Sequence, residues 1–374
     1  MLKKTRTKIL LLILVLVIFH AAGIAKDAGV FRSVEESQPF GQCEKLAGPI
    51  GAEDITVDRV QKLAYISADD RRQAFLDKDL KSYENGGIWT LDLSDPNSKP
   101  KQLMVKMKGA FHPHGIALRF EQQDGVQGKA IELYAVNHLD MQTHEIDVFS
   151  ILPDGNLKLR RRIPFPELIS PNDIAVVGKD RFFVSNDHGN PRHSVMEIVE
   201  DYAGLALSSL VYFDGEQGHT VIDGLRYTNG VTLSADQKTL FVAETTANQV
   251  SRYMKGQDML SWHLIDTVYI PMAVDNLEWL DDQHLLTAGH PKVFEFTAHM
   301  HDESHLSPSQ AFKIDVSGEK MQAESIYYDS GELISGTSVA SMYEDQLLLG
   351  AVFEPFALRC AKPAEAEKQS VAVE

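Results

Sequence analysis

Apolar and polar residues alternate in short paired runs along most of this chain. The stretch SPNDIAVVGKDRFFVSND, from Ser170 to Asp187, contains an apolar run, a polar turn and a second apolar run, with an Asn-Asp pair near each end. Alternation with a period of two, bounded by turn residues, predicts a strand, a turn and a second strand. The Asn-Asp pairs are unexpected there, because amides and carboxylates are poor strand formers.

Five further segments repeat this pattern. They are AEDITVDRVQKLAYISADD from Ala52, PHGIALRF with IELYAVNHLD from Pro113, TNGVTLSADQKTLFVAETT from Thr228, VDNLEWLDDQHLLTAGH from Val274 and, less clearly, TSVASMYEDQLLLGAVF from Thr337. A polar residue leads each unit, and these residues, 47 to 62 positions apart, are Glu53, His114, Asn172, Asn229, Asn276 and Ser338. A nearly even period of this length predicts repeated four-stranded sheets.

Six such sheets predict an all-β fold, a six-bladed β-propeller with a central channel. The inner strands of a propeller all start near one end of the channel, so the leading polar residues are expected to converge there. We place the propeller at residues 40–362, followed by a polar C-terminal tail at 363–374, because no linker or second domain is apparent.

The N-terminus has the layout of a secretory signal, with basic residues, the apolar run Ile9 to Phe19 and the small-residue stretch HAAGIA. Residues 1–25 are therefore predicted to be a cleaved signal peptide. The alternative is an uncleaved anchor, since only His20 interrupts the stretch from Ile9 to Ala25. Either way, the protein is expected to be exported to the periplasm or the extracellular space, with membrane association only through this segment.

The charge balance narrows the range of partners. Acidic residues outnumber basic ones by 53 to 36, for a formal charge of −17, and removal of residues 1–25 with their four basic and no acidic residues gives −21. Such an excess argues against a nucleic-acid partner and against electrostatic binding to anionic membranes. It suits hard cations.

Only two cysteines are present, Cys43 and Cys360. A single, widely separated pair in an exported protein favours a disulfide, with two unpaired buried thiols as the alternative. In a propeller such a bond would join the first and last segments and close the ring.

The residues expected to converge carry carboxylate and amide oxygens but no thiolate; they are Glu53, Asn172, Asn229, Asp275 and Asn276. Oxygen ligands in this number suit calcium better than zinc. Asp54 and Asp173 directly follow leading residues and could hold a second, more buried cation. Any single Asn-Asp or Asn-Gly is an ordinary turn signal, but five units with an oxygen donor in register favour a cation site.

The second unit differs, because His114 occupies the leading position and His138 ends the paired strand. Two histidines at corresponding ends of neighbouring strands predict a base and its proton-shuttling partner. His188 and His290 could line the same rim, although each alone is better explained by a structural role. The sequence contains no G-x-S-x-G elbow, no H-E-x-x-H motif and no phosphate-binding Gly-rich loop, which disfavours serine hydrolase chemistry.

From Cys43 to Cys360 the chain resembles the paraoxonase family, the calcium-dependent lactonases and arylesterases, within the wider group of gluconolactonases and senescence marker proteins. The motifs that carry the resemblance are AED, HPHGI, YAVNH, PNDIAVVG, SNDH, TNGVTLS, VAE, VDN, GHP and LLLGAVFEPFALRC. Each motif is short, but their order and spacing make the match specific.

This resemblance implies a six-bladed propeller with two calcium ions in its channel. It implies a catalytic calcium bound by the five convergent residues above, and a structural calcium bound by Asp54, Asp173 and the main-chain carbonyl of Ile116. It also implies a His114–His138 dyad, a Cys43–Cys360 disulfide and a substrate pocket lined by His290, Tyr227 and Ser338.

Three features depart from the pattern of the animal members. Leu139 stands where they have proline, and Gly289 stands where several have a free cysteine. The segment ADDRRQAF from Ala68, expected to be the loop after the first blade, is charged where they carry apolar and aromatic lid residues. These departures leave the substrate preference of this chain open, and the metal site is expected to be intact.

We predict a calcium-dependent hydrolase of lactones and aryl esters, which are small-molecule substrates. In this hypothesis calcium polarises the carbonyl, His114 deprotonates water and His138 relays the proton. The alternative is a non-catalytic propeller that uses calcium structurally and binds a ligand or partner protein, because propellers host many functions.

Overall fold

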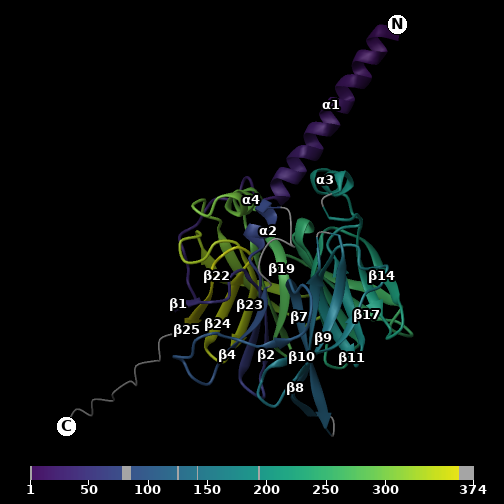
Figure 1. The fold of residues 1–374 in the computed structure, drawn as a ribbon. Helices are drawn as coiled ribbons and strands as arrows, with labels where there is room; N and C mark the ends of the chain where they lie inside the picture. The colour runs from purple at the N-terminus through teal and green to yellow at the C-terminus, as the bar shows by residue number, and fades with distance from the viewer. Residues whose placement is uncertain (1, 78–85, 124–125, 141, 193, 362–374) are drawn as a thin grey trace, which may run out of the picture.

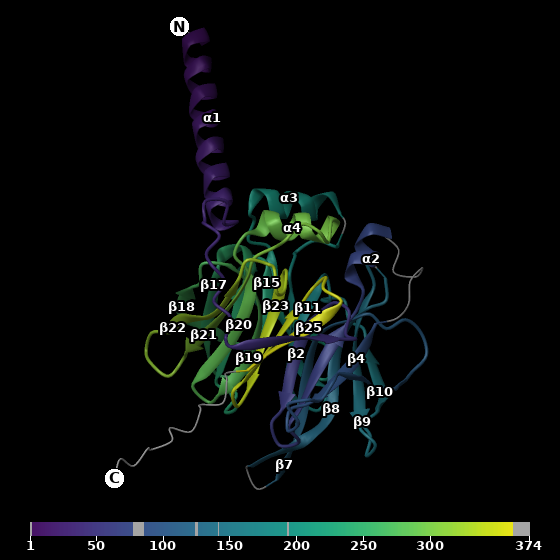
Figure 2. The same ribbon diagram turned by 90° about the vertical axis from the view of Figure 1, so that its left-hand side faces the viewer.

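The computed structural model describes residues 2–77, 86–123, 126–140, 142–192 and 194–361. Their strands form six sheets, and the inner strands of successive sheets contact one another in a closed ring (Figures 1 and 2). The predicted six-bladed β-propeller is therefore confirmed. The predicted polar tail at 363–374 lies outside the described residues.

The four main strands of each blade are antiparallel and follow one another from the axis outward. The strands of the first three blades are β2 (Ala52–Asp58), β3 (Leu63–Ala68), β4 (Gly87–Asp92) and β5 (Lys101–Gln102); β7 (Pro113–Gln123), β8 (Val126–His138), β9 (His144–Ile151) and β10 (Leu157–Ile163); and β11 (Pro171–Gly178), β12 (Arg181–Asn186), β13 (Ser208–Phe213) and β14 (Gly218–Leu225). A short strand, β6 (Val105–Lys106), pairs parallel with β10 and gives the second blade a fifth strand, which differs from the uniform four-stranded expectation.

The last three blades complete the ring. Their strands are β15 (Thr228–Leu233), β16 (Thr239–Glu244), β17 (Gln249–Lys255) and β18 (Trp262–Tyr269); β19 (Ala273–Asp281), β20 (His284–His290), β21 (Ser309–Asp315) and β22 (Gln322–Asp329); and β23 (Thr337–Tyr343), β24 (Gln346–Ala351), β25 (Phe356–Ala361) and β1 (Gln42–Ala47). The sixth blade thus takes its outer strand from the start of the propeller.

The apolar core consists of six layers, one between each pair of neighbouring blades. The layer between the first and sixth blades, for example, packs Ile55 and Leu91 against Val339 and Leu348. Equivalent clusters lie at the other five interfaces. Because the first blade is covered on both faces, its inner strand β2 is buried along its whole length.

Helices gather at one end of the propeller. They are α1 (Leu2–Asp27), α2 (Arg71–Asp77), α3 (Val195–Ala203) and α4 (Val293–His301), and η1 (Thr245–Ala247) is a single 3-10 turn. Helices α2, α3 and α4 each follow the second strand of a blade, whose last residues pair with the start of the inner strand. They therefore lie at the end where the inner strands begin, as Figure 2 shows.

Helix α1 projects away from the propeller at this same end (Figures 1 and 2). Its segment Lys8–Asp27 is long and apolar enough to cross a membrane, a property that N-terminal signal sequences share. The helix meets the propeller at its base, where the His20 ring nitrogen Nε2 lies 2.9 Å from the carbonyl of Ala203 and Asn248 donates to the carbonyl of Asp27.

The ring is closed by one edge pairing and one covalent bond. Strand β1 pairs antiparallel with β25, and Cys43 faces Cys360 directly in that register. The two residues form a disulfide across 317 positions of sequence, and no free cysteine remains among the described residues. The predicted disulfide is confirmed, and the alternative of two unpaired thiols is excluded.

We expect the double variant Cys43→Ser, Cys360→Ser to lose about 2 to 5 kcal/mol of unfolding free energy, because the bond restricts the unfolded chain over a very long loop. Urea unfolding of the residue 26–374 fragment, with and without the substitutions, measures the loss. Wild-type protein held in reductant is the matched control and should show the same loss. Equal midpoints in all three samples would mean that the β1–β25 ladder alone closes the ring.

Candidate active site and metal centre

All six inner strands are irregular next to their leading polar residue. The register with the second strand shifts between Ala52 and Asp54, Pro113 and Ile116, Pro171 and Ile174, Thr228 and Val231, Val274 and Leu277, and Thr337 and Val339. A β-bulge releases residues from the ladder and re-aims their side chains. Poor strand formers are tolerated at these positions because they contribute little to the ladder.

The bulges bring the leading residues together around Glu53. The Nδ2 atom of Asn276, from the fifth blade, donates to Glu53 Oε1 at 2.9 Å, and Ser338 Oγ, from the sixth, donates to the Glu53 carbonyl at 2.6 Å. His114 Nε2, from the second blade, lies 3.6 Å from Glu53 Oε1. The predicted convergence at one point on the axis therefore holds for these residues.

Two glycines allow the inner strands to approach this closely. A Cβ atom on Gly115 would stand 2.6 Å from the Asn172 carbonyl oxygen and from Asp173 Cα, and one on Gly230 would stand 2.6 Å from the Leu277 amide nitrogen. Real Cβ atoms do not come this near to backbone, so only glycine fits between the second and third blades and between the fourth and fifth.

The five predicted ligands of the first cation each present a buried oxygen without a hydrogen-bond partner. These atoms are Glu53 Oε2, Asn172 Oδ1, Asn229 Oδ1, Asp275 Oδ1 and Asn276 Oδ1. The amide nitrogens of Asn276 and Asn172 are occupied, by Glu53 and by Asp187 at 3.4 Å, which leaves their oxygens available. Buried polar atoms are rarely unpaired unless an ion or water completes them, and oxygens of this kind fit calcium.

Within the described residues, no three His, Cys, Asp or Glu side chains converge as in a preformed metal site. Three of the five candidate donors are asparagine amides, which lie outside that set of residue types. The agreement between these residues and a calcium site therefore depends on the five unpaired oxygens.

Burial also disfavours ionisation of the Glu53 carboxyl group in this centre. It raises the pKa of Glu53 to about 7, opposed by the charge of Arg71 and reinforced by that of Asp275. An ionised carboxylate here needs a nearby positive charge, which a divalent cation supplies.

The predicted second cation site lies one residue further along two of these strands. Asp54 Oδ2 accepts the Ile116 amide at 2.7 Å and Asp173 Oδ2 accepts the Val231 amide at 2.7 Å, so each carboxylate ties one blade to the next. Burial raises both pKa values well above the ordinary range, and repulsion from other carboxylates adds to it. Of the third predicted ligand, Ile116, the structure thus shows the amide group in contact with Asp54.

The two predicted catalytic histidines are in contact. His114 Nδ1 lies 3.0 Å from His138 Nε2, with the rings nearly perpendicular at 85°. Burial, the largest cause, holds the pKa of both rings well below the usual value, and the charges of Arg71 and Arg192 act in the same direction. Both rings are therefore neutral at pH 7, as a general base must be.

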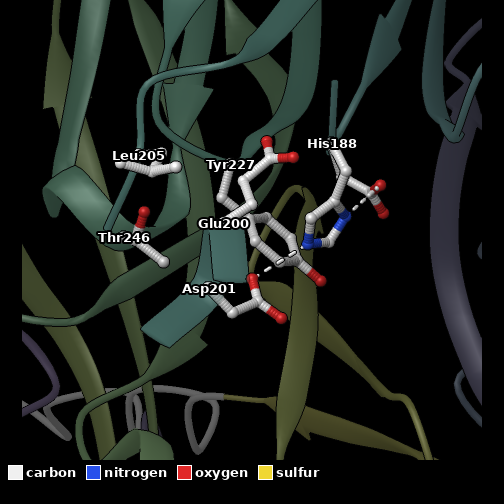
Figure 3. Close-up of a pocket in the computed structure, with 7 residues that line it drawn as sticks. His188, Glu200, Asp201, Leu205, Tyr227 and Thr246 are labelled. Carbon is white, nitrogen blue, oxygen red and sulfur yellow. Dashed lines mark hydrogen bonds and ion pairs between the residues drawn. The ribbon is translucent and has the colours of Figure 1, made fainter. Parts of the chain in front are cut away.

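His188 and Tyr227 border a small pocket beside this centre (Figure 3). The His188 ring bridges Asp187 at 2.8 Å and Asp201 at 2.9 Å, and it packs edge-on against Tyr227. Burial alone would lower the pKa of His188, but the two carboxylates raise it to about 10. His188 is therefore a charged member of an ion-pair network, which supports the structural role suggested for it.

The other two predicted pocket residues are buried. His290 Nε2 lies 3.3 Å from Asp275 Oδ2, and the ring stacks on Phe296 with centroids 3.6 Å apart. Ser338 is fully buried, and its hydroxyl is used by the Glu53 carbonyl. His290 is thus placed to orient a candidate cation ligand, whereas Ser338 joins the sixth blade to the first.

The charged segment ADDRRQAF is not a loop after the first blade, because it lies within that blade, between β3 and β4, and residues 71–77 form helix α2. Arg71 donates to the carbonyls of Gly51 and Pro113, the residue before His114. The charge expected for this segment is therefore present, and Arg71 places it directly beside the strand that carries His114.

Two features of the site escape sequence analysis. Arg192 donates to Asp187 Oδ2 at 2.9 Å and to Ser170 Oγ at 3.1 Å, and Asp187 in turn orients Asn172. Glu278, two residues after Asn276, belongs to the same group of carboxylates. Burial and the charge of Asp173 raise the pKa of Glu278, and the charge of Glu278 in turn raises the pKa of Asp54. The alternation of polar residues along β19 was a signal for Glu278, but nothing marks Arg192.

Comparison with known proteins places the whole propeller in one family. The profile of the family described as Arylesterase matches residues 45–361. Serum paraoxonase/arylesterase 2 of Gallus gallus is 29% identical over 315 residues, which cover 81% of this chain and 84% of that protein. Serum paraoxonase/lactonase 3 of Oryctolagus cuniculus is 26% identical over 334 residues, with coverage of 86% and 90%.

Among solved structures, a luciferin-regenerating enzyme superposes with a TM-score of 0.50 at 11% identity, covering 87% of this chain and 96% of that one. At this identity the likeness concerns the fold alone. The family match over nearly all of the propeller is stronger, and it agrees with the motifs that surround the site. The chain belongs to the Arylesterase family.

Proposed function

We propose that this protein is a calcium-dependent hydrolase of lactones and aryl esters. The observation that carries the proposal is the set of five buried, unpartnered oxygens next to a neutral histidine pair. Membership of the Arylesterase family and relatives named paraoxonase/arylesterase and paraoxonase/lactonase support esters and lactones as the substrate class. A small-molecule substrate is expected, and no nucleic-acid partner.

Two calcium ions are part of this proposal. The first would be held by Glu53, Asn172, Asn229, Asp275 and Asn276, and the second by Asp54, Asp173 and the carbonyl of Ile116. When bound, the first ion would supply a Lewis acid that polarises the substrate carbonyl and stabilises its oxyanion. Glu278 adds a carboxylate beside the second position.

The chain itself supplies the base. His114 Nε2 is the ring nitrogen on the side of Glu53, and it would take a proton from the water that attacks the carbonyl carbon. The contact between His114 Nδ1 and His138 Nε2 allows the positive charge to spread to the second ring. When the carbon–oxygen bond of the ester breaks, the same proton returns to the leaving alkoxide.

Several residues orient this machinery without touching the reacting atoms. Asp187, held by Arg192 and Ser170, fixes the amide of Asn172, and His290 fixes Asp275. Tyr227 and His290 are proposed to line the substrate pocket. Arg71 places its positive charge beside His114, so we expect substrate selectivity to differ from that of relatives with an apolar lid.

Export is also proposed. The disulfide suits an oxidising compartment, and residues 1–25 would act as a signal peptide or as an anchor that leaves the propeller at the membrane surface. The helices α3 and α4 lie at the same end as α1, so an anchored protein would present its site toward that surface (Figure 2).

The first prediction of this proposal is reversible calcium dependence. The residue 26–374 fragment should hydrolyse phenyl acetate and a panel of lactones, lose this activity when calcium is chelated, and regain it when calcium is restored. Circular dichroism checks that the propeller persists throughout. A folded, calcium-bound protein that hydrolyses none of these substrates would instead support the non-catalytic binding propeller.

A second prediction separates the base from the metal ligands. His114→Gln should lower kcat by about 10²- to 10⁴-fold while calcium still binds, because His114 is not a proposed ligand. Asn229→Ala is the matched comparison, and it should weaken calcium binding measured by titration calorimetry. Loss of calcium in His114→Gln, or unchanged turnover in it, would contradict this division of roles.

A third prediction concerns pH in the calcium-free protein. The pKa of Glu53 is raised from 4.5 to about 7, so the folded protein binds this proton more tightly than the unfolded chain does. Protonation of Glu53 therefore stabilises the fold. That contribution is fully present below about pH 4.5 and is lost as the pH rises through about 7. Glu53→Gln keeps a neutral side chain at every pH.

Wild-type stability should therefore fall relative to Glu53→Gln between these pH values. Urea unfolding of both proteins at several pH values tests this, and the variant cancels the contribution of the histidines, which titrate in the same range. Parallel stability curves for the two proteins would show that the Glu53 carboxyl is not strained by burial.

A further inference from the structure

Helix α2 holds an arginine beside the proposed active site. Arg71, the first residue of this helix, donates through Nη1 to the carbonyl of Gly51 at 2.8 Å and through Nη2 to the carbonyl of Pro113. Gly51 lies two residues before Glu53, and Pro113 lies directly before His114. The guanidinium therefore bridges the starts of the inner strands of the first two blades, at the end of the propeller where the helices gather (Figure 2).

The backbone fixes the position of this arginine. The Asp69 amide donates to the Gly51 carbonyl at 3.3 Å, and the Arg71 amide donates to the Asp69 carbonyl at 2.8 Å. Gly51 has a φ of 58°, and a Cβ atom there would stand 2.1 Å from the Asp69 carbonyl oxygen, so this close approach requires glycine. The start of α2 is thus tied to the start of β2, and the Arg71 side chain is held at the site.

The chain does not neutralise the positive charge of Arg71. Among the described residues, no carboxylate oxygen lies within ion-pair distance of its guanidinium, although acidic residues outnumber basic ones by 53 to 36. The two acidic residues just before it are engaged elsewhere. Asp69 Oδ1 lies 3.2 Å from His112 Nδ1. Asp70 Oδ1 accepts the Gln73 amide at 3.1 Å.

Two neighbouring arginines differ from Arg71 in this respect. Arg192 donates to Asp187 Oδ2 at 2.9 Å, so a buried carboxylate compensates its charge. Arg72 turns toward α4, where it donates to the carbonyl of His299. Of these three arginines, Arg71 is the one that stands beside the proposed base without a carboxylate of its own.

Part of the Arg71 guanidinium remains available to a ligand. An arginine has five N–H groups, and the two carbonyl contacts leave Nε without a hydrogen bond. Nε is not among the buried, unpartnered atoms of the described residues, so it is not sealed from solvent. Burial is the largest cause of the low pKa of His114, and the charge of Arg71 is the next. This charge is therefore felt where a substrate carbonyl would be attacked.

An anionic ligand would complete this arrangement. Backbone carbonyls can be bound by neutral donors, so a role as a strut between two blades does not by itself require a charge. A partly buried charge without a counterion is unfavourable, and a carboxylate brought by a ligand would remove that cost. Guanidinium and carboxylate groups match in shape, and their charge-assisted hydrogen bonds are stronger than neutral ones.

We propose that Arg71 is a specificity-determining residue that binds an anionic group of the substrate, so that the preferred substrates are lactones and esters that carry a carboxylate. The proposal rests on the proposed hydrolase function for its catalytic consequence. The acidic surface of the rest of the protein disfavours such substrates, and Arg71 supplies the local attraction that selects them.

Matched substrates test this in the calcium-loaded full-length protein. One pair is γ-carboxy-γ-butyrolactone and γ-valerolactone, and the other is para-carboxyphenyl acetate and para-methylphenyl acetate. Within each pair a carboxylate replaces a methyl group. The readout is the ratio of kcat/KM for the anionic substrate to kcat/KM for the neutral one, which cancels any effect of a variant on the shared chemistry.

Three variants complete the experiment. Arg71→Gln removes the charge but keeps an amide donor for a carbonyl, and Arg71→Lys keeps the charge but loses the paired N–H groups. Lys238→Gln is the matched control, because it removes one positive charge from an exposed side chain in the turn between β15 and β16, at the opposite end of the propeller.

In at least one pair, we expect the ratio in Arg71→Gln to be about 5- to 30-fold lower than in the wild type and in Lys238→Gln. The change should lie mainly in KM of the anionic substrate, and Arg71→Lys should give an intermediate ratio. Added salt should lower the wild-type ratio more than that of Arg71→Gln. A strut alone would change both substrates of a pair by the same factor, so an unchanged ratio in both pairs would overturn the proposal.

If the wild type hydrolyses none of the four compounds, the proposed function fails, and binding decides the role of Arg71. Titration calorimetry with glutarate should then show about 5- to 30-fold weaker binding to Arg71→Gln than to Lys238→Gln, and equal affinities would overturn the proposal. Should Arg71→Gln fail to fold, Arg71→Lys takes its place in both measurements, and a wild-type ratio or affinity in that variant would count against Arg71.

Discussion

The constraint on which this structure depends is the burial of negative charge at the axis of the propeller. Glu53, Asp275, Asp54 and Asp173 are almost inaccessible to solvent and lie close enough to repel one another. Four carboxyl groups in such a place would destabilise the fold if all were ionised. Glu53 and Asp275 each keep one buried oxygen without a hydrogen-bond partner among the described residues, and a cation would complete both oxygens.

A β-bulge at the start of the inner strand of every blade sets the positions of these carboxylates. An unbroken inner strand would direct neighbouring residues to opposite faces, into the apolar layers between blades. The bulge next to each leading residue interrupts that alternation, so consecutive residues such as Glu53 and Asp54 both escape the layers. Glycine at 115 and 230 then removes the side chains that would keep adjacent strands apart. The Asn-Asp pairs that seem misplaced in strands are therefore consistent with the bulges that hold them.

The sequence was sufficient for the features that repeat. Period-two alternation located both strands of each predicted pair. The even spacing of the leading residues predicted six blades and the convergence of these residues at one end of the channel. It was insufficient where a contact depends on two distant segments or on a turn. Arg192 reaches Asp187 and Ser170 from the connection before α3, and His144 meets His138 only because of the register of β8 with β9. Helix α2 was missed because its seven residues form less than the repeat needed for a helical pattern.

One physical cause, burial, acts in opposite directions on the two halves of the site. It disfavours every charge, so it raises the pKa of Glu53 and lowers the pKa of His114 only 3.6 Å away. An ion pair between Glu53 and His114 would require two buried charges on the protein. A cation bound to Glu53, with His114 left neutral, places only the carboxylate charge there and compensates it. A cation near Glu53 would further disfavour protonation of His114, because like charges repel. The burial that makes the centre suitable for a cation is thus the same one that keeps its histidines neutral, with a free lone pair.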